Sequence, residues 1–324
     1  MSATATTATP GPSTAPPHGE SLTRRSLRRL LRKRLAVICI VAIGVFFFVG
    51  IFANFVAPES YSHQNLDLSF NGPSLHHPFG TDILGRDVFS RNVYAARTTV
   101  IVTAATVLSG FVLLPVTLGM LAGYRRGFAD ALIMRAGEIL ASLPGLPMLV
   151  LINVTLRPRW DRWMQHIANG IHWDGFINEG FADYFLIFGV LSLFGWVGGA
   201  RIIRSQVLTL RNSEFITAAR ASGAGTPRIL YQHILPNIMP LIIVSASAAL
   251  GGIATAEIGL TFLGVGVQPP HPSFGSLISD GASRIVLQHH PEVLLVPAVI
   301  VAALIFSFNL LGDALNDVFT SRAA

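Results

Sequence analysis

The residues Glu214 to Pro236, which read EFITAARASGAGTPRILYQHILP, form a polar stretch between long apolar runs and decide how the rest of the chain is interpreted. Asn212 or Ser213 is placed to cap a first helix. Gly223 is expected to end this helix, at a position that favours a residue without a Cβ atom. Pro227 suits the first turn of a second helix, which ends or kinks at Pro236. The stretch therefore predicts a short helix, a glycine break and a second short helix.

The first of these helices carries a face of small residues. Ala218, Ala219, Ser222 and Gly223 are too small to anchor a core, but they let another backbone approach closely. Such a helix is suited to docking against a partner. The alternative interpretation is an ordinary loop between membrane spans.

The spacing of Ala218-Ala219, Gly223 and His233-Ile234-Leu235-Pro236 resembles the "EAA" loop of permease subunits in bacterial ABC importers. Thr217 stands where that family usually carries glutamate, and the sequence HILPN at 233–237 resembles its peptide and nickel branch. In that family the loop carries the coupling helix, which sits in a groove of the ATPase. The resemblance implies a set of ATPase-coupling residues: Glu214, Thr217, Ala218, Ala219, Gly223, His233, Leu235 and Pro236.

The composition is that of a membrane protein. Of the 324 residues, 51% are hydrophobic and 12% are charged, which makes a polytopic membrane protein more probable than a soluble domain. Cys39 is the only cysteine, so neither a disulfide framework nor a cysteine metal cluster is expected. Lys33 is the only lysine and is followed by Arg34, so a phosphate-binding loop is absent and this chain is not expected to hydrolyse ATP.

Residues 1–20 are rich in Ala, Thr, Pro, Ser and Gly, a composition that predicts a disordered tail. The segment 21–34 holds seven of the 23 basic residues and precedes the first apolar run. By the positive-inside rule it is a cytoplasmic segment. The alternatives are a twin-arginine export signal at Arg24-Arg25 and a nucleic-acid-binding arm. The long apolar run and the further spans behind the basic cluster disfavour both.

Six apolar runs are long enough to cross about 30 Å of hydrocarbon at about 1.5 Å per residue. They fall at 35–57, 98–123, 131–156, 184–203, 238–264 and 293–312. We therefore expect an all-α polytopic protein with both termini in the cytoplasm. The expected order is a first transmembrane helix at 35–57, an extracytoplasmic loop at 58–97 and a five-helix core at 98–318. The core includes a cytoplasmic loop at 204–237.

The first outer loop contains HPFGTD at 77–82 and GRDVFSR at 85–91. This turn-rich segment with paired charges is expected to close the outer rim, and it also resembles a signature of dipeptide and oligopeptide permeases. The pairs His76-His77 and His289-His290 are interpreted as solvated loop residues. Metal capture is the less favoured alternative, and no metal site is expected.

The third span and the segment after it carry two further signals. The sequence LPGLP at 143–147 predicts a bend inside the membrane, which suits a helix that lines a cavity or packs inside the bundle. In the outer loop at 157–183, Trp160, Trp163, Met164 and Ile167 fall on one helical face. This pattern predicts a separate helix at 159–171 that lies in the membrane interface.

The fifth span ends in EIGLTFLGVG at 257–266, which is followed by PPHPSFG at 269–275. An acidic residue inside a span is a functional-site candidate, but Glu257 lies near the outer end, and we expect it to hold the glycine-rich turn. A proton relay is the alternative. Both motifs resemble those of peptide permeases, with small departures at 258, 259 and 261. The candidate pore or gate residues are Glu257, Phe262 and Pro144.

These motifs occur in family order between residues 75 and 318, and the 157–183 loop lies outside the resemblance. The resemblance implies a type I ABC importer permease fold and a permease subunit that moves di- or oligopeptides across the cytoplasmic membrane of a prokaryote. It implies three kinds of partner: a homologous second permease, two ATPase subunits that bind ATP-Mg, and an extracytoplasmic substrate-binding protein. No cofactor in this chain and no nucleic acid are expected. Nickel, glutathione or another small solute is an alternative cargo. An ion-coupled secondary transporter is disfavoured because no internal repeat is visible, and a membrane enzyme because no catalytic group is.

Overall fold

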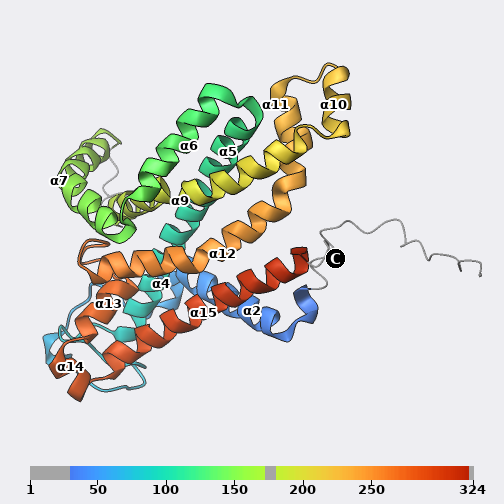
Figure 1. Cartoon of the computed structure of the whole chain (residues 1–324). Helices are drawn as coiled ribbons and strands as arrows, with labels where there is room; N and C mark the ends of the chain where they lie inside the picture. The colour runs from blue at the N-terminus through green and yellow to red at the C-terminus, as the bar shows by residue number, and fades with distance from the viewer. Residues whose placement is uncertain (1–29, 172–179, 321–324) are drawn as a thin grey trace, which may run out of the picture.

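The structure is a computed structural model that describes residues 30–171 and 180–320 (Figure 1). These residues form helices and connecting turns without a β-strand, so the predicted all-α class is confirmed. The helices before the third span are α2 (Arg34–Ile51), α3 (Ala53–Val56), η1 (Leu66–Leu68), α4 (Val88–Thr106), η2 (Val107–Leu113) and α5 (Leu114–Arg125). They are followed by α6 (Gly127–Ser142), α7 (Gly145–Ile171), α9 (Phe181–Leu210), α10 (Glu214–Ala221) and α11 (Thr226–Arg228). The last are η3 (Ile229–Ile234), α12 (Leu235–Phe262), α13 (Phe274–Gly281), α14 (Arg284–His289) and α15 (Glu292–Thr320). The tail predicted at 1–20 lies outside the described residues.

Among the described residues, five helical stretches are long and apolar enough to cross a membrane. They are Arg34–Ile51, Val88–Arg125, Phe181–Leu210, Thr226–Phe262 and Glu292–Val318. The helices α6 and α7 pass the same test together but meet at an angle of 94°. Counted as one broken span, they bring the total to six, which is the predicted number.

The second span begins ten residues earlier than predicted, at Val88, so the preceding loop ends at residue 87 and not at 97. The prediction was wrong because the first half of α4 contains Arg91, Asn92, Thr98 and Thr99, which lower its hydropathy. All four side chains are buried against other helices, where most of their polar atoms find partners.

The third span breaks where its prolines predicted a bend. Leu143, which precedes Pro144, has extended backbone angles (φ −82°, ψ 142°), as a residue before proline prefers. The helix predicted at 159–171 is not a separate element, because α7 runs through Pro158 without a break. Its predicted lipid-facing side chains are also not all exposed, since Met164 is buried in the chain itself and the Trp160 Nε1 donates to the Ala182 carbonyl at 2.8 Å.

The helices α5 and α9 pack closely through glycine. A Cβ atom added at Gly119 would lie 2.8 Å from the Ala200 carbonyl oxygen, and one added at Gly123 would lie 2.8 Å from Val207 Cβ. Small residues at such positions let two helix backbones approach, as is common in membrane bundles. This contact holds the end of α9 close to the α5–α6 turn.

The helices place the two sets of motifs at opposite ends of the molecule. Figure 1 shows α10 and α11 projecting at one end, while α13, α14 and the loop before α4 gather at the other. The start of α2 lies beside the end of α15, where Lys33 Nζ contacts Asp317 Oδ2 at 2.8 Å. The two ends of the described chain therefore lie on the same side of the bundle.

Candidate functional site

The helix α10 is attached to the bundle by a single buried side chain. Ile216 is fully buried, and it packs with Ile229 and Ile234 of the π-helical segment η3 and with Val207 of α9. One apolar residue among polar and small neighbours is enough to fix which face of this eight-residue helix points inward. The opposite face is left free.

The predicted glycine break is confirmed. Gly223 has a φ of +82°, and no atom lies within 4 Å of a Cβ added there. The reversed chain is held by bonds from the Gly223 N–H to the Arg220 carbonyl and from the Ala224 N–H to the Ala219 carbonyl. At the other end Ser213 is the N-cap residue, but its hydroxyl donates back to the Leu210 carbonyl at 2.6 Å and caps no helical N–H.

The free face of α10 contains most of the predicted coupling residues of the helix. Glu214, Thr217, Ala218 and Gly223 are exposed, whereas Ala219 is half-buried. Sequence reasoning missed two exposed aromatic residues in this segment: Phe215 of α10 is 43% exposed and Tyr231 of η3 is 58% exposed. The sequence could have indicated these residues, because each is a large aromatic residue within a polar stretch that offers no apolar helix face to pack against.

The second helix does not end at Pro236, one of the two predicted outcomes, because η3 continues directly into α12 and the helical run extends from Thr226 to Phe262. Proline has no N–H to donate to the residue four positions earlier, and the wider π turn before Pro236 takes up this gap. His233 and Leu235 are half-buried in this run, while Pro236 is exposed. They lead into the membrane span and do not belong to the free face of α10.

Arginines connect the α10 segment to the α5–α6 turn. Arg211 Nη1 donates to the carbonyl oxygens of Gly123 and Tyr124, at 3.4 and 3.1 Å, and these groups lie at the end of α5. The Arg220 guanidinium lies 5.3 Å from the centre of the Tyr124 ring. A displacement of α10 would therefore be transmitted to α5.

An ion pair braces the same end of the bundle. Arg204 of α9 donates through Nε and Nη2 to the two carboxylate oxygens of Asp130 in α6, at 2.5 and 2.6 Å. This two-point geometry fixes the orientation of both side chains. It holds α6 against α9 on the membrane side of the exposed α10 face.

Glu257 is enclosed by the chain and does not line a pore surface of this subunit. It is 0% exposed, and its Oε2 accepts a hydrogen bond from Thr99 of α4 at 3.0 Å. Its Oε1 lies 3.4 Å from the Thr261 hydroxyl oxygen, which in turn accepts the Val267 N–H at 3.3 Å. These contacts agree with the expectation that Glu257 holds the turn after α12, and its pore or gate role stays a prediction.

That turn and the start of α13 close tightly over the end of α12. Gly264 has a φ of +78°, and the Val265 N–H bonds to the Leu260 carbonyl, as in a glycine C-cap. A Cβ atom added at Gly275 would lie 2.3 Å from the Ile258 carbonyl oxygen. Gly264 is therefore required by its backbone conformation, and Gly275 by a close approach of two backbones.

The other two candidate pore or gate residues remain on the surface. Phe262 is 46% exposed at the end of α12, and Pro144 is exposed at the break between α6 and α7. The structure does not bring either of them next to Glu257. Their roles stay predictions.

The outer loop is held by a charge network at its predicted place on the rim. Asp82 accepts hydrogen bonds from Arg86 Nε at 2.7 Å and from Arg91 Nη1 at 2.6 Å. Arg91 Nη2 also donates to Asp280 of α13 at 3.2 Å. Asp87 caps α4 by accepting the Ser90 N–H at 2.8 Å. The paired charges of the motif therefore attach the loop to two helices.

The sequence predicted that all four loop histidines are solvated, and this is wrong for His77 and His290. His77 is buried with Nδ1 3.3 Å from Asp87 Oδ1, and His290 stacks on Phe70 with ring centres 4.7 Å apart. His76 and His289 are exposed. Among the residues that the structure describes, no group of three or more His, Cys, Asp or Glu side chains is arranged to hold a metal ion.

A second ion pair was missed by sequence reasoning. Arg157 of α7 donates through Nη2 to Asp183 Oδ1 of α9 at 2.5 Å and through Nη1 to the Gly266 carbonyl at 3.1 Å. Asp183 Oδ2 accepts the Gln268 N–H at 2.9 Å. The opposite charges at the two ends of the 157–183 loop were the available signal.

Comparisons with known proteins agree with the motifs. A family model described as "Binding-protein-dependent transport system inner membrane component" matches residues 115–324. A second model, described as "N-terminal TM domain of oligopeptide transport permease C", matches residues 21–75. The first match spans the 157–183 loop and the second covers the basic segment, so the similarity extends beyond the range that the motifs defined.

The chain is also similar to curated proteins over nearly its whole length. It is 34% identical to the dipeptide transport system permease protein DppC of Alkalihalophilus pseudofirmus, over 97% of this chain and 96% of that protein. It is 36% identical to DppC of Bacillus subtilis, over 93% of this chain and 86% of that protein. It is 34% identical to the oligopeptide transport system permease protein OppC of Bacillus subtilis, over 93% and 90%.

The exposed helix α10, the five membrane-spanning helical stretches with one further bent helix pair, and two family models over most of the chain lead to one conclusion. The chain belongs to the family of binding-protein-dependent transport system inner membrane components and is a multi-pass permease component of an ABC importer system, similar to DppC and OppC.

Proposed function

We propose that this chain is the permease subunit of an ATP-driven importer that moves di- or oligopeptides inward across the cytoplasmic membrane of a prokaryote. The observation that carries this proposal is the similarity to dipeptide and oligopeptide permeases over 93% or more of the chain. The cargo path would lie between this subunit and a homologous second permease. An extracytoplasmic binding protein would deliver the cargo.

The exposed face of α10 is the proposed contact with an ATPase subunit. It combines small residues that let a backbone approach, such as Ala218, with the exposed aromatic residue Phe215, and the neighbouring segment η3 adds the exposed Tyr231. Exposed aromatic side chains next to small residues are typical of surfaces that a partner covers. ATP-Mg would be bound and hydrolysed by the partner, because this chain lacks the lysine of a phosphate-binding loop.

The proposed orientation places α10 and both termini in the cytoplasm. The basic cluster at 21–34 directly precedes the first span and sets this orientation by the positive-inside rule. With this orientation, the loop before α4 and the start of α13 would lie on the extracytoplasmic side, where a binding protein would dock.

Transport by the reconstituted complex tests the proposal. The chain would be co-expressed with the other components of its importer, placed in vesicles with ATP on the cytoplasmic side, and supplied with the binding protein and a radiolabelled dipeptide or pentapeptide. We expect ATP-dependent peptide accumulation that unlabelled peptide competes away. Accumulation of nickel or glutathione in place of either peptide would establish the alternative cargo. Accumulation that follows an ion gradient without ATP would contradict the importer class.

A further inference from the structure

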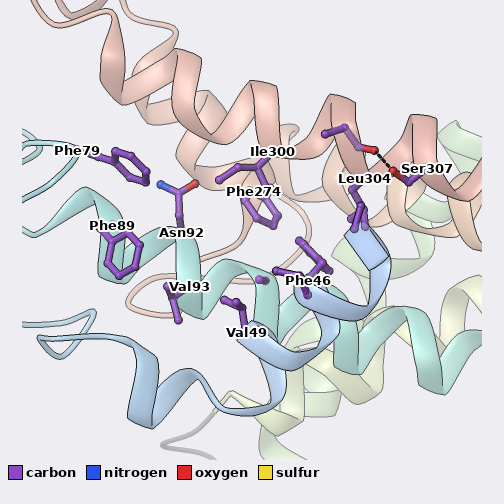
Figure 2. Close-up of a pocket in the computed structure, with 14 residues that line it drawn as sticks. Phe46, Val49, Phe79, Phe89, Asn92, Val93, Phe274, Ile300, Leu304 and Ser307 are labelled. Atoms are coloured by element: carbon purple, nitrogen blue, oxygen red, sulfur yellow. Dashed lines mark hydrogen bonds between the residues drawn. The ribbon is translucent and has the colours of Figure 1, made fainter. Parts of the chain in front are cut away.

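A cavity of about 500 Å³ lies between α2, α4, α13 and α15 (Figure 2). Its lining is apolar except for two side chains, Asn92 of α4 and Ser307 of α15. The Ser307 hydroxyl already donates to the Ala303 carbonyl at 2.7 Å. The volume of the cavity lies within the range of about 300–1,000 Å³ that small-molecule sites occupy.

Asn92 carries an acceptor without a partner in this cavity. The side chain is 4% exposed, and its Nδ2 donates to the Val88 carbonyl at 2.8 Å. Among the residues that the structure describes, none donates a hydrogen bond to its Oδ1. Because a buried acceptor is destabilising when it stays unpaired, a donor from outside the chain is expected there.

The polar atom and the apolar volume lie at different distances from the helix starts. Asn92 is the fifth residue of α4 and thus lies about 6 Å from the start of that helix. Ser307 is the sixteenth residue of α15 and lies about 22 Å from its start. Figure 2 shows Asn92 near Phe79 and Phe89 at one end of the cavity and Ser307 at the other. The acceptor is therefore near the ends at which α4 and α15 begin, and the apolar part extends toward the middle of these helices.

The cavity also opens toward the membrane. Ala42 and Val45 of α2 and Ala303 of α15 line it and are exposed on the outside of the bundle. Water is a poor occupant, because a bound water needs two to four polar partners and Asn92 Oδ1 is the one free acceptor in the described lining. Hydrocarbon chains surround this part of the bundle and match the lining.

We propose that this cavity binds the acyl chain of a membrane lipid whose head group donates a hydrogen bond to Asn92 Oδ1. In the orientation proposed above, the lipid belongs to the outer leaflet. It fills the space between α2 and the helices α4 and α15, so the lipid supports the contact of the first helix with the core. This proposal does not depend on the identity of the cargo.

Photolabelling of the full-length chain in lipid vesicles tests the cavity. The vesicles consist of phosphatidylcholine with a small fraction of phosphatidylethanolamine that carries a photoreactive acyl chain. We expect labelled peptides from the cavity wall, around Val93 and Leu304. Ala303→Phe places a ring in the cavity mouth and should remove most of this label, whereas Ala302→Phe, an exposed neighbour outside the lining, should keep it.

Two lipid probes that differ only in the head group test the hydrogen bond to Asn92. Phosphatidylethanolamine has N–H donors, whereas phosphatidylcholine has none, so probes with the same acyl chain isolate the hydrogen bond. One hydrogen bond of ordinary strength predicts that the cavity wall is labelled about fivefold more by the phosphatidylethanolamine probe. In Asn92→Leu the two probes should label equally. Equal labelling of the wild type by both probes, or unchanged labelling of Ala303→Phe, would overturn the proposal, whether or not the importer carries peptides.

Discussion

The free face of α10 and the enclosed end of α12 each contain glycine and glutamate, but these residues are exposed in the first region and enclosed in the second. Gly223 has open space around it and Glu214 is exposed, whereas Gly275 touches the backbone of α12 and Glu257 is fully buried. The first region is prepared for a contact that this chain alone does not complete, and the second is complete within the chain. Substitutions in the two regions should therefore separate folding from association.

The largest effect on folding is expected at Gly275. Gly275→Ala puts a Cβ atom 2.3 Å from the Ile258 carbonyl oxygen and 2.7 Å from the Phe262 nitrogen, so α13 must move away from α12. We expect a large loss of folded protein in detergent extracts, measured by fluorescence-detected size-exclusion chromatography. Gly259→Ala is the matched control, because no atom lies within 4 Å of a Cβ added at Gly259. Equal loss in both variants would show that the close approach at Gly275 is not what matters.

The next largest effect is expected at Glu257. Glu257→Ala leaves the buried hydroxyl of Thr99 without its acceptor and opens a void, which should lower the free energy of unfolding by about 3 kcal/mol. Glu214→Ala removes the same side chain from an exposed position and should leave the melting temperature nearly unchanged. The measurement is thermal unfolding of the purified chain in one detergent. Similar melting temperatures for the two variants would show that the buried Glu257 stabilises the fold no more than the exposed Glu214.

A smaller effect on stability is expected at the ion pair that links α9 to α6. The Arg204–Asp130 pair is partly exposed, with 33% and 15% of the two side chains accessible. Such a pair contributes about 1 kcal/mol or less to stability. A double-mutant cycle with Arg204→Ala and Asp130→Ala should give a coupling free energy of that size in thermal unfolding. A coupling free energy near zero would mean that the bidentate contact does not brace α6 against α9.

The same contrast explains what the sequence could predict. The helix-break-helix pattern at 214–228 and the bend at Pro144 follow from local rules for glycine and proline, and both are confirmed. The first half of α4 could not be recognised, because the polar residues there are paired with groups far away in sequence, such as Pro272 and Glu257. The exposed aromatic residues Phe215 of α10 and Tyr231 of η3 were missed for the opposite reason, since only the structure shows how much of each ring stays exposed.

The central claim is that the free face of α10 is the surface on which an ATPase docks. Ala218→Glu places a charge on this face at an exposed position, so folding should be unaffected. Against a close-packed partner the buried charge is strongly unfavourable. Thr217→Glu is the matched control, because it adds the same side chain one position away and is the residue that the resembling family usually carries.

The most direct measurement is ATPase retention when the whole importer is purified through a tag on this chain. The account predicts that Ala218→Glu inserts into the membrane and melts like the wild type but loses most of the ATPase subunits, together with peptide uptake. Thr217→Glu should retain both. Normal ATPase retention and normal uptake in Ala218→Glu would show that the docking surface lies elsewhere.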